Sequence, residues 1–110
     1  MISMIPGKNV HAEISVIPLG KGTETSMSKE IAAAFDAISK VKGIRSMLTP
    51  MGTQIESESI DGILKVIEVA HRALKLAGAK RIISNIRIDE RLDKSQTLED
   101  RVNVVENKRV

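Results

Sequence analysis

The chain has 110 residues, 42% of them hydrophobic and 28% charged, so we expect one folded domain over residues 1–110 rather than a disordered protein. It contains no cysteine, which excludes disulfides, thiol chemistry and thiolate metal sites. The net charge is only +3 and Phe35 is the sole aromatic residue, so we expect no nucleic-acid partner. No apolar run approaches membrane-spanning length and the first residues do not resemble a signal peptide, so we expect a cytoplasmic protein with no membrane partner.

Four stretches have the pattern of β-strands. Residues 10–17 alternate between apolar and polar side chains, and residues 81–89 do so again later in the chain. Residues 44–48 and 53–58 are two runs of strand length on either side of residues 49–52, whose sequence is TPMG. Proline followed so soon by glycine is typical of a tight turn, so these two runs are predicted to form a β-hairpin.

Apolar residues recur at helical spacing in two stretches between the predicted strands. The first helix is expected to begin at Ser26 or Ser28 and to stop at Gly43. The second is expected to run from a cap at Ser59 to Gly78, with an apolar surface wider than one sheet needs. Its core stripe is predicted to consist of Ile60, Ile63, Leu64, Ile67, Ala70 and Leu74, and the wider surface of Val66, Val69, Ala73 and Leu76.

A third, shorter helix is predicted after Thr97, which is placed to cap it. Leu98, Val102 and Val105 then share one face of this helix. So short a helix is marginally stable alone, and its apolar face is therefore expected to dock on another surface.

This order of elements predicts an α+β, ferredoxin-like βαββαβ sandwich with a short C-terminal helix. Its four-stranded antiparallel sheet carries both long helices on one face. With the first strand between the third and the fourth, Glu13 and Ser15 are expected beside Asn85 and Arg87 on the face that the helices leave open. Function is expected on that open face.

Glu13 and Arg87 have two interpretations at this stage. An exposed cross-strand ion pair contributes at most about 1 kcal/mol and implies no function. Against that, further short polar side chains are expected to converge there from separate segments, namely Ser26 or Ser28, Thr49, Met51 and Thr53. A carboxylate, hydroxyls, a thioether and the amides of a glycine turn suit a small polar heterocycle better than they suit catalysis.

The histidines give weak support for a metal site, because His11 and His71 lie in different elements and neither has a partner at the spacing of a helical metal site. Charged side chains alternate in sign over residues 87–93. They either form a ladder of salt bridges, exposed to solvent or between subunits, or face a ligand. No phosphate-binding glycine loop or nucleophile motif is present in the sequence.

Five segments taken together resemble the small thiamine-binding protein family, ferredoxin-like domains related to the bacterial protein YkoF. The segments are residues 12–20, 26–29, 50–56, 71–73 with 78–81, and 86–91 with 93–94. The similarity covers about residues 10–106 and leaves residues 1–8 unexplained.

The resemblance implies a cytoplasmic, non-enzymatic binder of thiamine or its hydroxymethylpyrimidine moiety, acting as carrier, buffer or sensor, with no cofactor and no metal. It implies a homotetramer built as a dimer of dimers. By the same resemblance, Glu13 accepts a hydrogen bond from the aminopyrimidine, and Met51 packs on its ring. The implied ligand-binding residues are Glu13, Ser26, Ser28, Thr49, Met51, Gly52, Thr53, Arg87 and Asp89.

Three other functions remain open. The first is a structural or regulatory homo-oligomer with no vitamin ligand, in which Glu13 and Arg87 pair across an interface. The second is an enzyme that uses Glu13 and Asp89 as acid and base, although no sequence feature indicates a shifted pKa for either. The third is nucleic-acid binding, which would show a steep dependence on salt.

Overall fold

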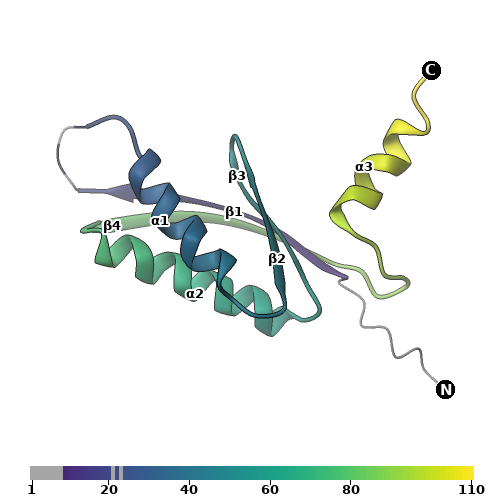
Figure 1. Ribbon diagram of the computed structural model, residues 1–110, viewed down its shortest axis with the longest axis horizontal. Coiled ribbons are helices and arrows are strands. Elements are labelled where there is room, and N and C mark those ends of the chain that lie inside the picture. Colours follow the sequence, from purple (N-terminus) through teal and green to yellow (C-terminus); the bar gives the residue numbers. More distant parts are fainter. Residues whose placement is uncertain (1–8, 21, 23) are drawn as a thin grey trace.

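The computed structural model describes residues 9–20, 22 and 24–110, so the unexplained residues 1–8 lie outside the described part (Figure 1). Four strands and three helices follow one another in the predicted order. They are β1 (Val10–Leu19), α1 (Ser28–Ser39), β2 (Ile44–Thr49), β3 (Gly52–Ser57), α2 (Ile60–Leu76), β4 (Arg81–Glu90) and α3 (Leu98–Glu106).

The strands form one antiparallel sheet in the order β2-β3-β1-β4, with β1 between β3 and β4 as predicted. Helices α1 and α2 pack on each other and cover one face of the sheet, while α3 stands away from them near one end (Figure 1). The α+β, ferredoxin-like class with an added C-terminal helix is therefore confirmed.

The pairing register confirms the predicted neighbours on the open face. Glu13 lies opposite Arg87 and Ser15 opposite Asn85 in the β1–β4 ladder. On the other side of β1, Glu13 lies opposite Gln54 of β3. Because side chains alternate along a strand, these residues project from the face that α1 and α2 leave uncovered.

Strand β1 is longer than its hairpin partner. It pairs with β4 from Val10 as far as Leu19, whereas its pairing with β3 ends at Ile14, opposite Thr53. Residues 15–19 of β1 therefore have a free edge on the hairpin side.

The core confirms most of the predicted stripe of α2 but corrects one position. Ile63, Val66, Ala70 and Leu74 are fully buried, whereas Leu64, predicted to be in the core, is 54% exposed. Val66, which we placed on the wider surface, is 0% exposed. The buried positions follow a three-then-four spacing, and Leu64 lies about 100° around the helix from Ile63, so only one of these neighbours can face the sheet.

Two of the three predicted caps are confirmed. The Ser59 hydroxyl accepts from the Gly62 N–H, and Thr97 forms a capping box with Asp100. The cap of the first helix was wrong: Met27 occupies the cap position without a side-chain cap bond. The Ser26 hydroxyl, one residue before the cap position, accepts from the N–H of Ser28, the first residue of α1, whereas a cap residue accepts from the second or third helical N–H.

Gly62 in the first turn of α2 has a packing role that its position in a helix does not suggest. A Cβ at this position would collide with the Ser57 hydroxyl oxygen and lie 3.0 Å from Ile44 Cδ1. The Ser57 hydroxyl is itself fixed by hydrogen bonds to the Ser59 backbone.

We therefore expect Gly62→Ala to destabilise the protein by about 1–3 kcal/mol, because overpacking outweighs the gain of about 1 kcal/mol in helix propensity. Urea unfolding measures the change. The matched control is Gly62→Ala combined with Ser57→Ala, which removes the colliding oxygen and should recover part of the loss. A Gly62→Ala protein as stable as the original would contradict this packing.

Candidate functional site

Helix α3 is attached to the open face of the sheet by a buried carboxylate. Glu56 of β3 is 1% exposed, and its Oε1 accepts from Arg45 Nη1 at 2.7 Å and from the backbone N–H of Leu98. Leu98 is the first residue of α3, so the carboxylate sits at the positive end of the helix dipole. The other amino group of Arg45 donates to Glu99. Polar contacts rather than apolar burial therefore position the helix, since α3 has no buried residue.

His11 supplies a second attachment for the same helix. It is 4% exposed, with its Nε2 at 2.8 Å from the Gln96 carbonyl oxygen and its Nδ1 at 3.1 Å from Arg101 Nη1. A carbonyl only accepts and a guanidinium only donates, so this geometry requires a neutral imidazole with its hydrogen on Nε2. Arg101 also donates to Asp89 at 2.6 Å. The chain thus uses His11 to hold α3.

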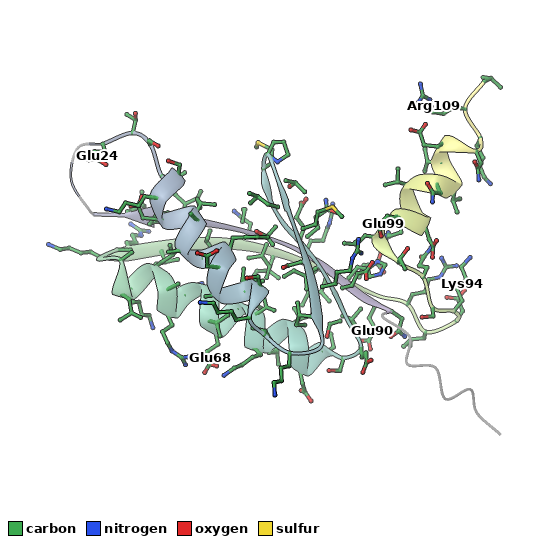
Figure 2. The ribbon with its side chains drawn as sticks, in the orientation of Figure 1. Glu24, Glu68, Glu90, Lys94, Glu99 and Arg109 are labelled. Carbon is green, nitrogen blue, oxygen red and sulfur yellow. The ribbon has the colours of Figure 1, made fainter. Side chains whose placement is uncertain are left out.

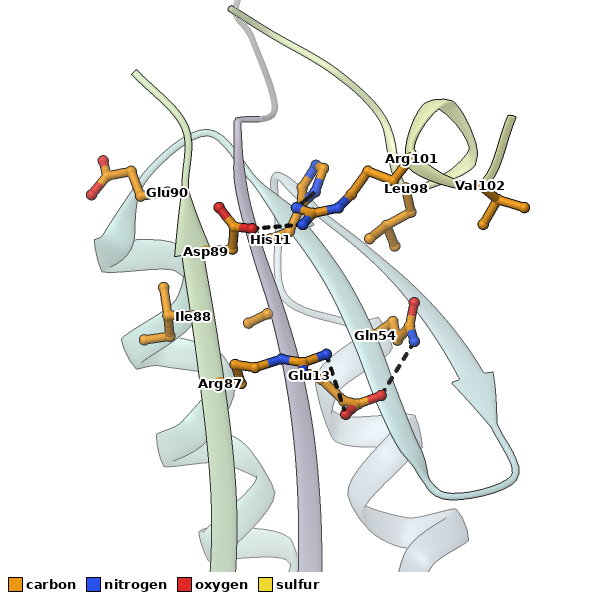
Figure 3. Close-up of a pocket in the computed structure, with 11 residues that line it drawn as sticks. His11, Glu13, Gln54, Arg87, Ile88, Asp89, Glu90, Leu98, Arg101 and Val102 are labelled. Atoms are coloured by element: carbon orange, nitrogen blue, oxygen red, sulfur yellow. Dashed lines mark hydrogen bonds and ion pairs between the residues drawn. The ribbon is translucent and has the colours of Figure 1, made fainter. Parts of the chain in front are cut away.

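A cavity of about 640 Å³ lies between the open sheet face and α3 (Figure 3). We call it the outer pocket. Strands β1, β3 and β4 supply its floor, and α3 supplies one wall. Its lining residues are His11, Ala12, Glu13, Gln54, Arg87, Ile88, Asp89, Glu90, Leu98, Arg101 and Val102.

Glu13 is a carboxylate on the floor of this pocket with few hydrogen-bond partners. Its Oε2 accepts from Gln54 Nε2 at 3.2 Å, whereas its Oε1 is 3.9 Å from Arg87 Nη2, too far for a hydrogen bond (Figure 3). Asp89, by contrast, is engaged by Arg101, and that hydrogen bond holds the pKa of Asp89 below its ordinary value. Glu13 therefore keeps acceptor capacity for a ligand, and Asp89 stays ionised at neutral pH.

A second cavity, of about 270 Å³, lies where β1 extends past the hairpin. We call it the hairpin notch. It is bounded by the free edge of β1, by α1 and by the tip of the β2–β3 hairpin. Its lining residues are Ile14, Ser15, Val16, Ile17, Met27, Ile31, Ala34, Ile38, Leu48, Thr49, Pro50, Met51, Gly52 and Thr53.

The structure divides the predicted site residues between these two cavities. Glu13, Arg87 and Asp89 line the outer pocket, whereas Thr49, Met51, Gly52 and Thr53 line the hairpin notch. Ser26 and Ser28 line neither, and their hydroxyls lie 3.1 Å apart. The division follows from the register: Thr53 pairs with Ile14 and shares its helix-covered face, whereas Glu13 projects from the open face.

One glycine stands between the two cavities. A Cβ at Gly52 would lie 3.0 Å from the Ile14 carbonyl oxygen and 3.6 Å from Glu13 Cγ. The hairpin tip therefore approaches β1 as closely as a backbone without a side chain allows.

Sequence reasoning missed several outer-pocket residues. Gln54 could have been found, because the predicted hairpin places it opposite Glu13. The contribution of Leu98, Arg101 and Val102 could not, because nothing in the periodicity says that α3 turns back over the open face. His11 was considered only as a metal ligand or a strand residue.

Two further observations concern the described part of the chain. None of its helices is both long and apolar enough to cross a bilayer. It also contains no group of three or more histidine, aspartate or glutamate side chains arranged to hold a metal ion.

Fold and cavities together define a small ferredoxin-like protein with pockets against a four-stranded sheet. Comparison with known proteins gives the family: residues 12–106 match the model of the thiamine-binding protein family, and the chain belongs to it. A UPF0045 protein of Methanothermobacter thermautotrophicus is 37% identical over 99 residues, covering 90% of this chain and 98% of that protein. The predicted resemblance is therefore confirmed.

Solved structures agree with the fold. The crystal structure of a hypothetical protein from Methanocaldococcus jannaschii has 37% identity and a TM-score of 0.77, over 88% of this chain and 95% of that one. A Thermotoga maritima protein, provisionally described as a thiamine biosynthesis/salvage protein, has 24% identity and a TM-score of 0.70. That alignment covers 87% of this chain and 97% of the Thermotoga chain.

The attachment of α3 through Glu56 can be tested with a conservative substitution. We expect Glu56→Gln to weaken the bonds to Arg45 and Leu98 and to cost about 1–3 kcal/mol in stability, since the site is buried. Amide hydrogen exchange should accelerate over residues 98–106 and remain slow in α2. Glu99→Gln is the matched control, because its ion pair with Arg45 is exposed to solvent and should contribute little to stability. Equal effects of the two substitutions would contradict a special role for Glu56.

Acid is expected to release α3. Hydrogen bonds from Arg101 and Arg45 lower the pKa values of Asp89 and Glu99, respectively. Groups with a lowered folded pKa contribute full stability above their unfolded pKa and lose it as the pH falls through the folded value. The contribution is therefore constant near neutral pH and disappears in the acid range.

The measurement is amide exchange of residues 98–106 at neutral and at acid pH, corrected for the intrinsic rate and compared with α2. Loss of protection in α3 before α2 is the expected result. Protection of α3 that is unchanged down to the acid unfolding of the whole chain would show that these charges do not hold it.

Proposed function

We propose that this protein is a non-enzymatic binder of thiamine or its hydroxymethylpyrimidine moiety, and that the outer pocket is its site. The single observation that carries the proposal is Glu13, a carboxylate with unused acceptor capacity on the floor of a cavity of about 640 Å³. An aminopyrimidine offers the N–H groups that such a carboxylate binds. A cavity of this size is within the usual range for small-molecule sites, about 300–1,000 Å³.

The charges of the outer pocket support the same proposal. Its carboxylates belong to Glu13, Asp89 and Glu90, and its guanidinium groups to Arg87 and Arg101. Three negative groups against two positive ones suit the cationic thiazolium of thiamine, while Arg87 remains able to meet a hydroxyl or a phosphate ester. The family's description as thiamine-binding, and the provisional description of the Thermotoga protein, point to the same ligand class.

A role in binding rather than catalysis fits the ionisation of the pocket. General acid–base catalysis at neutral pH works best with a group whose pKa lies near the ambient pH. Arg101 shifts the pKa of Asp89 downward, away from that range. We therefore propose a cytoplasmic carrier, buffer or sensor, with no cofactor and no metal.

Assembly into a homotetramer, as a dimer of dimers, is part of the proposal. Helix α3 exposes 59% of Val102 and 63% of Val105, and the preceding loop exposes Leu92 as well. Apolar side chains gathered on a segment with no buried residue are typical of surfaces that pack against another chain. The same observation favours the second candidate, a structural or regulatory homo-oligomer without a vitamin ligand.

Calorimetry with thiamine, hydroxymethylpyrimidine and thiamine diphosphate tests the proposal, after unfolding and refolding to remove any ligand carried from the cells. We expect micromolar binding of thiamine or the pyrimidine, about −8 kcal/mol, and at least tenfold weaker binding by Glu13→Gln, about 1.4 kcal/mol. Glu68→Gln, an exposed carboxylate on α2, is the matched control and should leave binding unchanged.

The oligomeric state of each variant is measured by light scattering in parallel. An intact oligomer that binds none of the three compounds would overturn vitamin binding and leave the structural oligomer. Dissociation of Glu13→Gln without any ligand effect would place Glu13 in an interface.

A further inference from the structure

Strand β4 forms one edge of the sheet and offers a long row of unpaired backbone groups. It pairs with β1 over Arg81–Glu90, and its other side meets no strand of the described residues (Figure 1). The Arg91 N–H donates to the Asn9 carbonyl at the end of this ladder. Hydrogen-bonded and non-hydrogen-bonded pairs alternate along an antiparallel ladder, so odd-numbered residues of β4 direct their peptide groups toward β1. The even-numbered residues, from Ile82 onward, therefore direct theirs outward.

This edge has none of the usual protection against pairing with another strand. Natural edge strands are often short, or are interrupted by a proline, a bulge or an inward-pointing charge. β4 has ten residues and no proline, and its register with β1 is continuous from one end to the other. Residues 82–86, in its middle, carry no charge. A long and regular edge of this kind is expected to be covered by another strand.

Exposed apolar side chains lie beside the same edge. Ile88 of β4 pairs with the buried Ala12 and shares its face of the sheet, yet it is 41% exposed. On α2, His71 contacts β4, with its Nε2 3.0 Å from the Ser84 hydroxyl oxygen. Leu64 comes two helical turns before His71 and so lies on the same flank of α2. Its exposure of 54% therefore falls next to the unpaired edge.

The charges of β4 suit a second copy of the same strand. Basic residues lie at its start, namely Lys80 and Arg81. Acidic residues lie at its end, namely Asp89 and Glu90, next to the segment that leads to α3 (Figure 2). Both groups are four and five residues away from Asn85. With Asn85 on a two-fold axis, Arg81 lies opposite the partner's Asp89, and Lys80 opposite the partner's Glu90.

The apolar side chains agree with this register. On the helix-covered face, Ile82 lies opposite the partner's Ile88, and Ser84 opposite the partner's Ile86. The partly exposed Ile88 therefore meets an apolar neighbour, as cross-strand pairs require. The flank of α2 that carries Leu64 lies over the same junction.

Charge also excludes the adjacent registers. Because hydrogen-bonded pairs must join even-numbered residues of both strands, the axis can move only from one residue to the next. An axis at Ser84 places Arg81 opposite the partner's Arg87, and an axis at Ile86 places it opposite the partner's Arg91. Like charges directly opposite each other are destabilising, so the axis at Asn85 is favoured over both.

We propose that two copies of this chain pair along β4 in antiparallel orientation, with Asn85 on the two-fold axis, and so join their four-stranded sheets. Arg81 and Asp89 both project from the open face, and Asp89 lines the outer pocket. The pairing therefore places the partner's Arg81 at the border of that pocket. Each subunit contributes a cation to the pocket of the other. The proposal names one interface of the proposed homotetramer and rests on that part of the proposed function alone.

Cysteine cross-linking tests the register directly, because the chain contains no cysteine of its own. In a non-hydrogen-bonded antiparallel pair the two Cα atoms lie about 4.5 Å apart, a distance that a disulfide spans. We expect Asn85→Cys to form a covalent dimer on mild oxidation. Ile83→Cys, on the same face, is the matched control and should not, because its two copies lie about 14 Å apart. A mixture of Ile83→Cys and Arg87→Cys should give the mixed dimer.

An exchange of charges gives a second test. Lys80→Glu places like charges opposite each other twice in the dimer. We expect it to raise the dissociation constant of the dimer, measured by sedimentation, about tenfold. Adding Glu90→Lys restores opposite charges and should recover most of the affinity. Lys42→Glu makes the same change at an exposed position between α1 and β2, and this matched control should leave the dimer unaffected.

The failures can be told apart. Equal cross-linking of Asn85→Cys and Ile83→Cys would overturn the register. An oligomer in which Asn85→Cys does not cross-link and Lys80→Glu has no effect would overturn the β4 interface but leave the homotetramer. A monomer at every concentration would overturn both, whatever calorimetry shows for thiamine. Thermal unfolding in reductant shows whether each variant folds. Should Asn85→Cys fail to fold, the Lys80 and Glu90 variants still decide the question.

Discussion

The unequal lengths of neighbouring strands determine most of what this molecule offers to a ligand. β1 has ten residues and is paired along its length with the ten residues of β4, whereas β3 has six. The hairpin therefore supports only the first half of β1. Where it ends, the core would be open at one side of β1, and the hairpin notch forms there. A hairpin of matching length would have continued the ladder past Ile14 and closed the notch.

The opposite face of the sheet depends on a different kind of interaction. Helix α3 has no buried residue, and its place is set by Glu56, by His11 and by their arginine partners. Directional polar bonds fix orientation without requiring much apolar contact area. The outer pocket can therefore remain open beneath the helix, because dense packing is not what holds α3 in place.

Local patterns were sufficient to predict the fold. Alternation in residues 10–17, the turn before Gly52 and the helical stripes gave the class, the strand order and the pairing of Glu13 with Arg87. The prediction failed where two adjacent side chains competed for one buried position, as with Ile63 and Leu64. The predicted cap of α1 was wrong because the cap position falls on Met27, between Ser26 and Ser28, and Met27 has no hydroxyl.

The candidate site was harder to predict than the fold for two reasons. It depends on the face of the sheet from which each side chain projects, and on the packing of α3 against a sheet formed by residues far away in the sequence. Thr53 and Gln54 are sequence neighbours, yet they line different cavities. Neighbouring residues of a strand project from opposite faces of the sheet. The prediction grouped residues by their segment of the sequence, and it therefore combined residues of two separate cavities into one site. The return of α3 over the open face rests on contacts such as that between Glu56 and Leu98, which are 42 positions apart and follow no periodic pattern.

Gly52 gives the outer pocket and the hairpin notch a common boundary. The hairpin tip lies against the Ile14 carbonyl on one side and the stem of Glu13 on the other, with no side chain between them. A molecule that displaces the tip from within one cavity thereby changes the shape of the second. Thermodynamic linkage then requires the effect to be reciprocal. If a molecule in one cavity changed the affinity of the other cavity for its own occupant by some factor, that occupant would change the affinity of the first cavity by the same factor. Because Gly52 carries no side chain, a movement of the hairpin tip on one side of this boundary is transmitted directly to the other side.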